Sequence, residues 1–159
     1  MMKYNAALVV NTFLNTGKFS QLYSYLLESA EKRGIRLEIK KTADIPLLAG
    51  HKPQNYDFML WWDKDVSLAE LYEDRGIRLY NSARSIELCD NKAKTVTALC
   101  SHPDIFIPKT LFAPKTFTGV GYTDLSFLKA AEELLGYPFV IKKCFGSFGA
   151  QVYLVHSFD

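Results

Sequence analysis

The chain has 159 residues, of which 48% are apolar and 23% are charged, a composition typical of soluble globular proteins and sufficient for one domain or two small ones. Its formal net charge is +2 without a basic block, so we expect no nucleic-acid partner. The three cysteines and three histidines are scattered without metal or disulfide spacing, and the apolar run of residues 6–10 is too short to cross a bilayer. These features predict a cytoplasmic protein with no membrane partner and no metal site of its own.

Strand and helix patterns alternate in the first half of the chain. Gly34 and Gly76 each follow a helical pattern in the repeated sequence Arg-Gly-Ile-Arg-Leu, and glycine suits the left-handed residue that closes a helix. A strand that begins directly afterwards is typical of α/β units, so we expect a parallel sheet with right-handed crossovers. The expected strands are residues 6–11, 35–40, 57–62 and 77–81. The expected helices are residues 19–33, with Leu22, Tyr25, Leu26 and Ser29 near one face, and residues 67–75, beginning at the capping box Ser67-Leu68-Ala69-Glu70.

The second half has a different pattern, and we place a domain boundary near residue 88, giving domains of residues 1–87 and 88–159. Asp90 is expected to cap a helix over residues 91–101, and a second helix is expected over residues 124–135. Strands are expected at residues 110–113, 139–143 and 151–156, the last two joined as antiparallel neighbours by a glycine-rich connection.

That connection, Gly146-Ser147-Phe148-Gly149, is a candidate phosphate loop, because bare backbone approaches an anion closely and points its N–H groups at it. A plain hairpin turn uses the same residues. Lys142 lies just before the loop on an apolar strand and has to reach water or an anion, because burying an unpaired lysine is costly.

A second candidate is the sequence Asp90-Asn91-Lys92-Ala93-Lys94-Thr95. A lysine in the first turn of a helix opposes the helix dipole, whereas a phosphate bound there gains from the lysine and from free backbone donors. The alternative is that Lys92 and Lys94 are ordinary surface lysines. We expect Lys92 and Lys142 to converge beside the glycine turn.

Residues 61–65, Trp-Trp-Asp-Lys-Asp, end the third expected strand at its carboxyl edge, where α/β sheets place ligands. They form either a substrate contact or a buried tryptophan followed by a helix-capping Asp65. Residues 15–19 echo the end of a P-loop, but Thr12 and Phe19 replace its first glycine and its hydroxyl residue, which excludes that motif.

Taken in order, these sequences resemble ATP-grasp ligases, and among them the RimK-type glutamate ligases. The resemblance covers the whole chain and is most specific in residues 81–155. Its motifs are Asn81-Ser82-Ala83, Ile86, Asp90-Asn91-Lys92, Thr95, Pro108-Lys109-Thr110, residues 136–142, residues 146–149 and Val152-Tyr153-Leu154. It implies an α/β fold in which a small parallel-sheet pre-ATP-grasp domain (residues 1–87) precedes the incomplete α+β small, lid-side subdomain of an ATP-grasp domain (residues 88–159).

The resemblance also implies chemistry. Such ligases use ATP and Mg²⁺ to phosphorylate a carboxylate, and an amine then attacks the acylphosphate to form an amide or peptide bond, with glutamate addition as one example. Lys92 and Lys142 match the lysines that hold the ATP phosphates, and Gly146, Ser147, Phe148 and Gly149 match the flexible cover over the triphosphate. The implied partners are ATP, a carboxylate and an amine, or a protein or peptide acceptor.

Three departures qualify the resemblance. Lys143 stands where proline is frequent, and Gln151 stands where a further glycine is common, which would strain glutamine if the position needs a positive φ. The adenine-binding strand and the acidic and Asn ligands of Mg²⁺ are absent. We therefore expect a truncated piece of a parent ligase that is inactive alone, binds ATP weakly and exposes an apolar face that favours homo-oligomers. The alternative function is a non-catalytic nucleotide- or partner-binding module.

Overall fold

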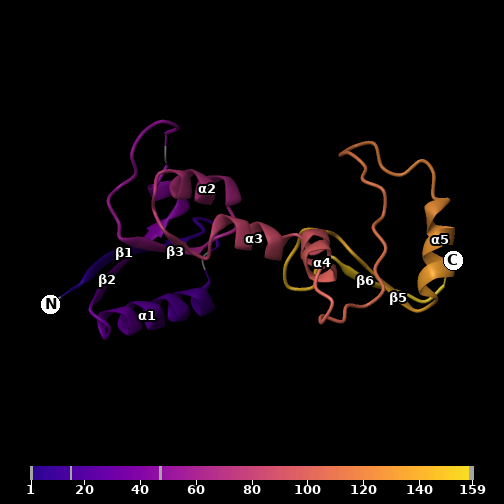
Figure 1. The fold of residues 1–159 in the computed structure, drawn as a ribbon, viewed down its shortest axis with the longest axis horizontal. Helices are drawn as coiled ribbons and strands as arrows, with labels where there is room; N and C mark the ends of the chain where they lie inside the picture. The colour runs from indigo at the N-terminus through magenta and orange to yellow at the C-terminus, as the bar shows by residue number, and fades with distance from the viewer. Residues whose placement is uncertain (1, 15, 47, 158–159) are drawn as a thin grey trace. The chain divides into compact units, whose positions relative to one another are not determined.

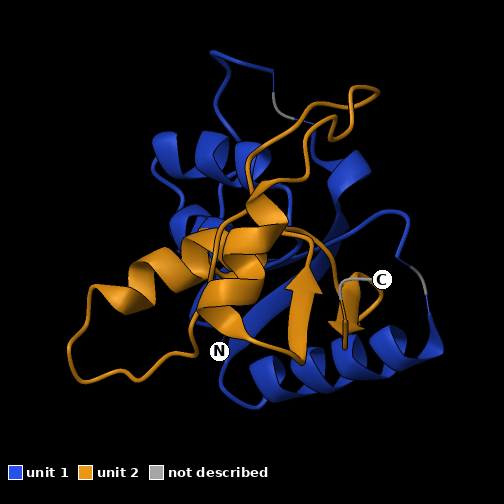
Figure 2. Ribbon diagram, turned by 90° about the vertical axis from the view of Figure 1, so that its right-hand side faces the viewer, with its two compact units in different colours: residues 1–87 blue, residues 88–159 orange. Residues whose placement is uncertain are grey.

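The computed structural model describes residues 2–14, 16–46 and 48–157, which form two compact units, residues 1–87 and residues 88–159 (Figure 2). The division between the units falls inside helix α3 (Ala83–Asp90), an element that the sequence analysis missed. Ser82 precedes this helix and its side-chain oxygen accepts a hydrogen bond from the Ser85 N–H at 3.2 Å, so a capping residue was present as a signal.

A four-stranded parallel sheet forms the centre of residues 1–87, as predicted. The strands lie in the order β2-β1-β3-β4, so that β1 is flanked on both sides. Residues 6–10 of β1 are all buried, whereas β4 at the edge has two residues, fewer than predicted. The bounds are β1 (Tyr4–Val10), β2 (Ile35–Lys41), β3 (Phe58–Trp62) and β4 (Leu79–Tyr80).

Helices cover both faces of this sheet (Figure 1). Successive β1 side chains point to opposite sides, so apolar residues lie on both faces and each face packs against helices. Leu8 and Val10 pack with Tyr23 of α1 (Gly17–Glu31) on one face. Ala7 and Val9 belong to the cluster on the other face, which includes residues of α2 (Val66–Asp74) and α3. The result is a doubly covered sheet whose carboxyl edge remains open for the loops that follow β1 and β3.

The buried face of α1 differs from the predicted one. Tyr23 and Ala30 are buried, with Phe19 and Leu26 packed beside Tyr23, whereas Tyr25 is 65% exposed. These four inward residues are separated by four, three and four positions, the regular spacing of one helix face. The predicted face was wrong because it included Tyr25, whose side chain is apolar but exposed.

The start of α2 also corrects a prediction. Asp65 is the N-cap, and its Oδ1 accepts a hydrogen bond from the Leu68 N–H at 3.0 Å. The predicted capping box at Ser67 is wrong, because Ser67 already lies inside the helix. The sequence offered two overlapping cap signals, and the aspartate that directly follows the strand loop is the one used.

Residues 88–159 contain two further helices and an antiparallel hairpin. The hairpin strands β5 (Phe139–Lys142) and β6 (Val152–Val155) are antiparallel neighbours, as predicted. Their register pairs Phe139 with Val155 and Lys142 with Val152. The helices are α4 (Lys92–Cys100) and α5 (Phe127–Leu135). Asn91 rather than Asp90 is the N-cap of α4.

The strand predicted at residues 110–113 does not form, and this prediction is wrong. Pro108 and Pro114 flank the segment, and neither has the N–H group that a strand ladder requires. A short 3₁₀ helix, Thr42–Asp44, opens the loop predicted between β2 and β3.

The cap of α2 can be tested with a matched pair of substitutions. Asp65→Ala removes the acceptor for the Leu68 N–H and should lower the free energy of unfolding by about 1 kcal/mol. Ser67→Ala, at the position predicted from sequence, should change it little. Urea denaturation followed by circular dichroism measures both, and a larger effect of Ser67→Ala would contradict the assignment.

A second test uses pH. The Tyr56 hydroxyl donates to Glu38, and this hydrogen bond lowers the pKa of the Glu38 carboxyl, assisted by Lys40. A carboxyl with a lowered folded-state pKa contributes stability above its unfolded-state pKa and loses it as the pH falls through the folded-state value. Glu38→Gln should therefore reduce the free energy of unfolding at about pH 7 but not at about pH 3. Denaturation at both pH values checks this, and an equal loss at both would show that the ionised form is not the stabilising one.

Candidate functional site

The glycine-rich loop between β5 and β6 has an unusual backbone. Gly146 and Gly149 have φ angles of 132° and 74°, and Phe148 between them has a φ of 60°. Phe148 is also 91% exposed. A bulky residue in the left-handed region costs about 1–2 kcal/mol, so the surrounding loop imposes a conformation that Phe148 alone would not choose.

Lys92, at the start of α4, is attached to this loop through two atoms. Its backbone N–H donates to the Cys144 carbonyl oxygen at 2.9 Å, and its Nζ donates to the Gly146 carbonyl oxygen at 2.9 Å. The residue is half-buried. Lys92 is therefore not an ordinary surface lysine, because its ammonium is held beside the glycine turn with two of its three N–H donors still available.

The backbone donors of α4, in contrast, are already used. The Lys92 N–H is bound to Cys144, and the Asn91 Oδ1 accepts from the N–H groups of Ala93 and Lys94 at 3.0 Å and 3.2 Å. The expectation that free helix donors would bind a phosphate here is wrong. Asparagine is among the preferred N-cap residues, so Asn91 was a signal for this cap in the sequence.

The loop itself supplies the remaining backbone donors. Within the described part of the chain, the N–H groups of Gly146, Phe148 and Gly149 have no hydrogen-bond acceptor. Successive N–H groups in a turn that includes left-handed residues form a concave anion-binding arrangement. The loop thus offers donors to an anion on the same turn that Lys92 contacts.

Lys142 is the last residue of β5, opposite Val152. Its side chain is exposed and has no hydrogen-bond or ion-pair partner among residues 2–14, 16–46 and 48–157. Lys142 is therefore at the end of β5 that leads into the loop. Its convergence with the Lys92 ammonium stays a prediction.

Gln151 occupies the closing position of the loop without backbone strain, since Phe148 is the non-glycine residue with a positive φ there. The strain considered for Gln151 from the family pattern does not arise. The Gln151 side chain covers Gly146, and a Cβ added to Gly146 would lie 2.0 Å from the Gln151 Oε1. The Lys143 N–H donates to the Gln151 carbonyl oxygen at 3.1 Å, a hydrogen bond that proline at position 143 would remove.

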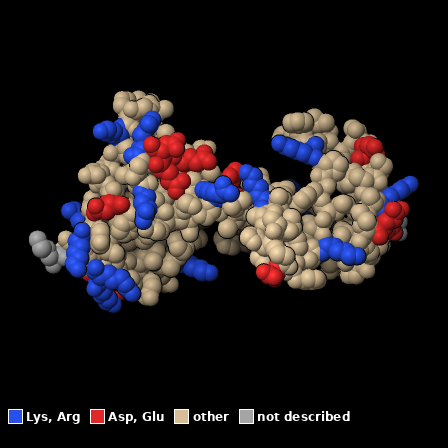
Figure 3. Space-filling view, viewed as in Figure 1, with Lys and Arg blue, Asp and Glu red and all other residues tan. Residues whose placement is uncertain are grey.

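No group of three or more His, Cys, Asp or Glu side chains in the described residues is arranged to hold a metal ion. None of the helices in this part of the chain is long and apolar enough to cross a membrane. On the face shown in Figure 3, basic and acidic side chains are interspersed, with acidic residues gathered over α2.

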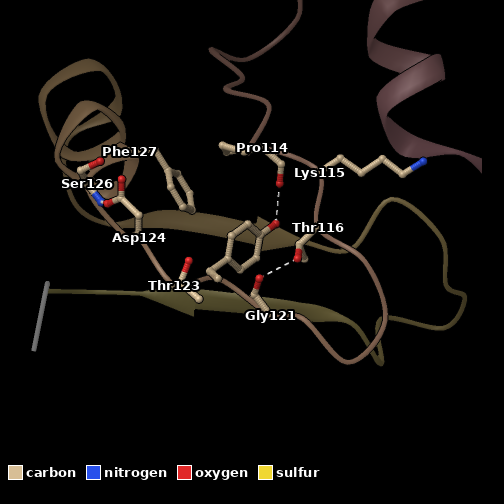
Figure 4. Close-up of a pocket in the computed structure, with 9 residues that line it drawn as sticks. Pro114, Lys115, Thr116, Gly121, Thr123, Asp124, Ser126 and Phe127 are labelled. Atoms are coloured by element: carbon tan, nitrogen blue, oxygen red, sulfur yellow. Dashed lines mark hydrogen bonds between the residues drawn. The ribbon is translucent and has the colours of Figure 1, made fainter.

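A depression of about 310 Å³ lies elsewhere in residues 88–159, between the segment Pro114–Thr116 and the segment that leads into α5 (Figure 4). The Tyr122 hydroxyl donates to the Pro114 carbonyl oxygen at 2.7 Å and the Thr116 hydroxyl to the Gly121 carbonyl oxygen at 2.6 Å. Asp124 accepts from the Ser126 N–H, which lowers the pKa of its carboxyl. These bonds close the loop on itself, and none of the predicted site residues lines the depression.

In residues 1–87, the cluster that ends β3 has a mainly structural role. Trp61 is 1% exposed and packs against Tyr72 with ring centroids 5.8 Å apart, and Asp65 caps α2. This agrees with the structural alternative for those two residues. Trp62 and Asp63 also lie at the carboxyl edge of the sheet, and this structural role does not account for them.

Comparison with known proteins gives relatives but no family model, since none matches the chain. The chain is 29% identical over 157 residues to the uncharacterized protein MG012 homolog of Mycoplasma pneumoniae, which covers 96% of this chain and 54% of that protein. It is 36% identical over 92 residues to human N-acetylaspartylglutamate synthase A, covering 58% of this chain and 22% of the synthase.

A solved structure, a RimK domain ATP-grasp protein from Sphaerobacter thermophilus, matches with a TM-score of 0.71 at 21% identity over 96% of this chain and 54% of that one. The chain spans about half the length of the Mycoplasma pneumoniae relative and of this solved chain. The α/β fold predicted from the motifs is confirmed by this likeness.

The geometry of the loop predicts unequal effects of two alanine substitutions. Gly146→Ala should destabilise the hairpin by about 1–3 kcal/mol, because its φ is unfavourable and its Cβ would displace the Gln151 side chain. Gly149 has a φ of 74°, close to the left-handed region that other residues can adopt, and open space around a new Cβ, so Gly149→Ala should cost less. Hydrogen exchange of the β5 and β6 amides measures both, and equal effects would show that Gln151 yields freely.

Proposed function

We propose that this chain, which has the fold of the amino-terminal part of a RimK-type ATP-grasp ligase, binds the phosphates of ATP and belongs to an ATP-dependent carboxylate–amine ligase. The observation that carries the proposal is the half-buried Lys92 ammonium held 2.9 Å from the Gly146 carbonyl oxygen. A cation next to a turn with unpaired N–H groups is suited to a phosphate chain, because phosphoryl transfer depends on positioning and charge neutralisation.

Each residue of the site has a distinct part in this proposal. Lys92 neutralises phosphate charge with its two remaining donors, and the N–H groups of Gly146, Phe148 and Gly149 donate hydrogen bonds to phosphate oxygens. Ser147 belongs to the same turn, and Lys142 contributes a second cation from the strand that leads into it. When bound, ATP supplies the phosphoryl group that activates a carboxylate towards an amine.

The described residues fit the phosphates but do not provide a set of Mg²⁺ ligands, so no role in holding that ion is assigned to them. The human relative is a synthase of N-acetylaspartylglutamate, a product that contains glutamate. This supports an amino acid, with glutamate as the specific candidate, as the amine substrate of the whole ligase. Because the chain spans about half of its relative and of the solved ATP-grasp chain, we propose that it gives no amide product alone.

The nucleotide site can be tested by isothermal titration with a non-hydrolysable ATP analogue. Lys92→Met removes the ammonium and its bond to Gly146 but keeps the backbone hydrogen bond to Cys144, so one of the two attachments to the loop persists while the affinity should fall about tenfold. Lys142→Met should weaken binding as well. Lys129→Met, an exposed lysine on α5, is the control and should leave the affinity unchanged.

Equal affinities for Lys92→Met and Lys129→Met would contradict the proposed phosphate site. The affinity of the unmodified chain should also fall as salt is raised, because the contacts are ionic. An assay for amide formation tests the proposed inactivity of this chain, because product from the chain alone would contradict it. The same assay distinguishes a ligase from a non-catalytic binding module. Nucleotide binding without any product from a full-length ligase containing this chain would favour a non-catalytic binding module.

A further inference from the structure

The carboxyl edge of the parallel sheet contains two polar atoms that are buried without a partner among the described residues. One is the hydroxyl of Tyr23, and the other is the Oδ2 of Asp63. Tyr23 is only 9% exposed. Buried polar groups in native proteins are nearly always hydrogen-bonded, so such a pair requires an explanation beyond packing.

Both groups belong to the same edge. Tyr23 lies in the second turn of α1 and packs against Val10, the last residue of β1. Helix side chains lean towards the helix N-terminus, so its hydroxyl extends towards the end where β1 leads into α1. Asp63 directly follows β3, whose last residue pairs with Val10.

The electrostatic environment of Tyr23 supports this placement. Burial raises the pKa of the Tyr23 hydroxyl, and the negative charge of Asp63 raises it further. The Asp63 carboxylate therefore acts on the phenol across the edge. Its other oxygen, Oδ1, accepts from the Asp65 N–H at 2.7 Å, which fixes the carboxylate in position.

The start of α1 adds the opposite charge. The N-cap Thr16 makes no side-chain hydrogen bond to the helix, and the first turn has no acidic residue and contains Lys18. In the described part of the chain, the N–H groups of Gly17, Lys18 and Phe19 have no acceptor. Unused first-turn donors and the helix dipole favour an anion at this position.

Residues 11–14, which follow β1, are held by hydrogen bonds within the protein. The Asn11 Oδ1 accepts from the N–H groups of Phe13 and Leu14 at 2.9 Å and 3.1 Å. The hydroxyl oxygens of Thr12 and Thr42 lie 3.0 Å apart and link the ends of β1 and β2. The edge is thus preorganised, with acceptors on one side and helix donors on the other.

We propose that this edge binds a small zwitterion, an amino acid whose ammonium donates to Asp63 and Tyr23 and whose α-carboxylate accepts from the first turn of α1. The two opposite charges at the edge favour a ligand that carries both charges. An anion alone would leave Asp63 unpaired, and a cation alone would leave the helix donors unpaired. Only the biological role of the amino acid, as the amine substrate, rests on the proposed ligase function.

The test is an NMR titration of the full chain with glycine, L-alanine, L-aspartate and L-glutamate. At least one should shift the amide signals of residues 17–19 and 63–65. For the amino acid that binds, the analogue without the ammonium and the α-amide analogue, such as glutarate and L-isoglutamine for glutamate, should bind about tenfold more weakly.

Two substitutions with matched controls complete the test. Tyr23→Phe removes a buried hydroxyl that has no partner in the described part of the chain, so the thermal midpoint should not fall, while the affinity should fall several-fold. Asp63→Asn retains an acceptor for Asp65 and should lower the affinity about tenfold. Tyr25→Phe, on the exposed side of α1, and Asp74→Asn, at the exposed end of α2, should leave the affinity unchanged.

Three outcomes would overturn the inference: no shift with any of the amino acids, equal binding of the analogue that lacks the ammonium, or unchanged affinity in Tyr23→Phe and Asp63→Asn. Because the Lys92→Met variant leaves this edge intact, it should bind the amino acid normally. Amino-acid binding without binding of the ATP analogue would contradict the proposed function but support this site. Binding of the ATP analogue without amino-acid binding would support the proposed function and contradict this site.

Discussion

The attachment of Lys92 to the glycine loop determines what residues 88–159 offer to a ligand. The backbone N–H and the side-chain ammonium of one residue contact the carbonyl oxygens of Cys144 and Gly146, so the start of α4 and the loop form one structure. A lysine bound to a carbonyl oxygen keeps its full charge, since a neutral acceptor cannot cancel it. The loop therefore carries a positive group without closing around an acidic partner.

The same attachment divides the backbone donors into two classes. Those of α4 are used internally by Asn91 and Cys144, and those of Gly146, Phe148 and Gly149 have no acceptor among the residues that the structure describes. The left-handed Phe148 is a second sign that the loop conformation is imposed by its surroundings. Strained and unpaired groups concentrated on one turn are typical of functional loops, and here they coincide with the motif that resembles ATP-grasp ligases.

Much of the fold was predictable because its signals are local. Gly34 and Gly76 close helices with φ angles of 73° and 86°, and the Ile-Arg-Leu sequences after them lead into the parallel strands β2 and β4. Predictions were wrong where two signals compete. Asp65 and Ser67 are both good caps, and only the path of the chain after β3 decides between them.

The site was predictable in part, for a different reason. The motifs indicated Lys92 and the glycine loop, but the contact between them joins residues 54 positions apart, which no local pattern reveals. Nor does the sequence show that the Tyr23 hydroxyl lacks a partner among residues 2–14, 16–46 and 48–157, because that depends on the packing of α1 against β1 and on the position of Asp63. Unpaired groups are a property of the packed molecule.

Strand β3 contains both tryptophans of the chain, next to each other and facing opposite sides of the sheet. Trp61 is shielded in the core, whereas Trp62 reaches solvent at the carboxyl edge. The tryptophan fluorescence of the protein therefore originates in residues 1–87, from one indole inaccessible to a dissolved quencher and one accessible to it. Acrylamide or iodide would distinguish these two emitters, so the chain carries its own unlabelled reporter at the edge of the sheet.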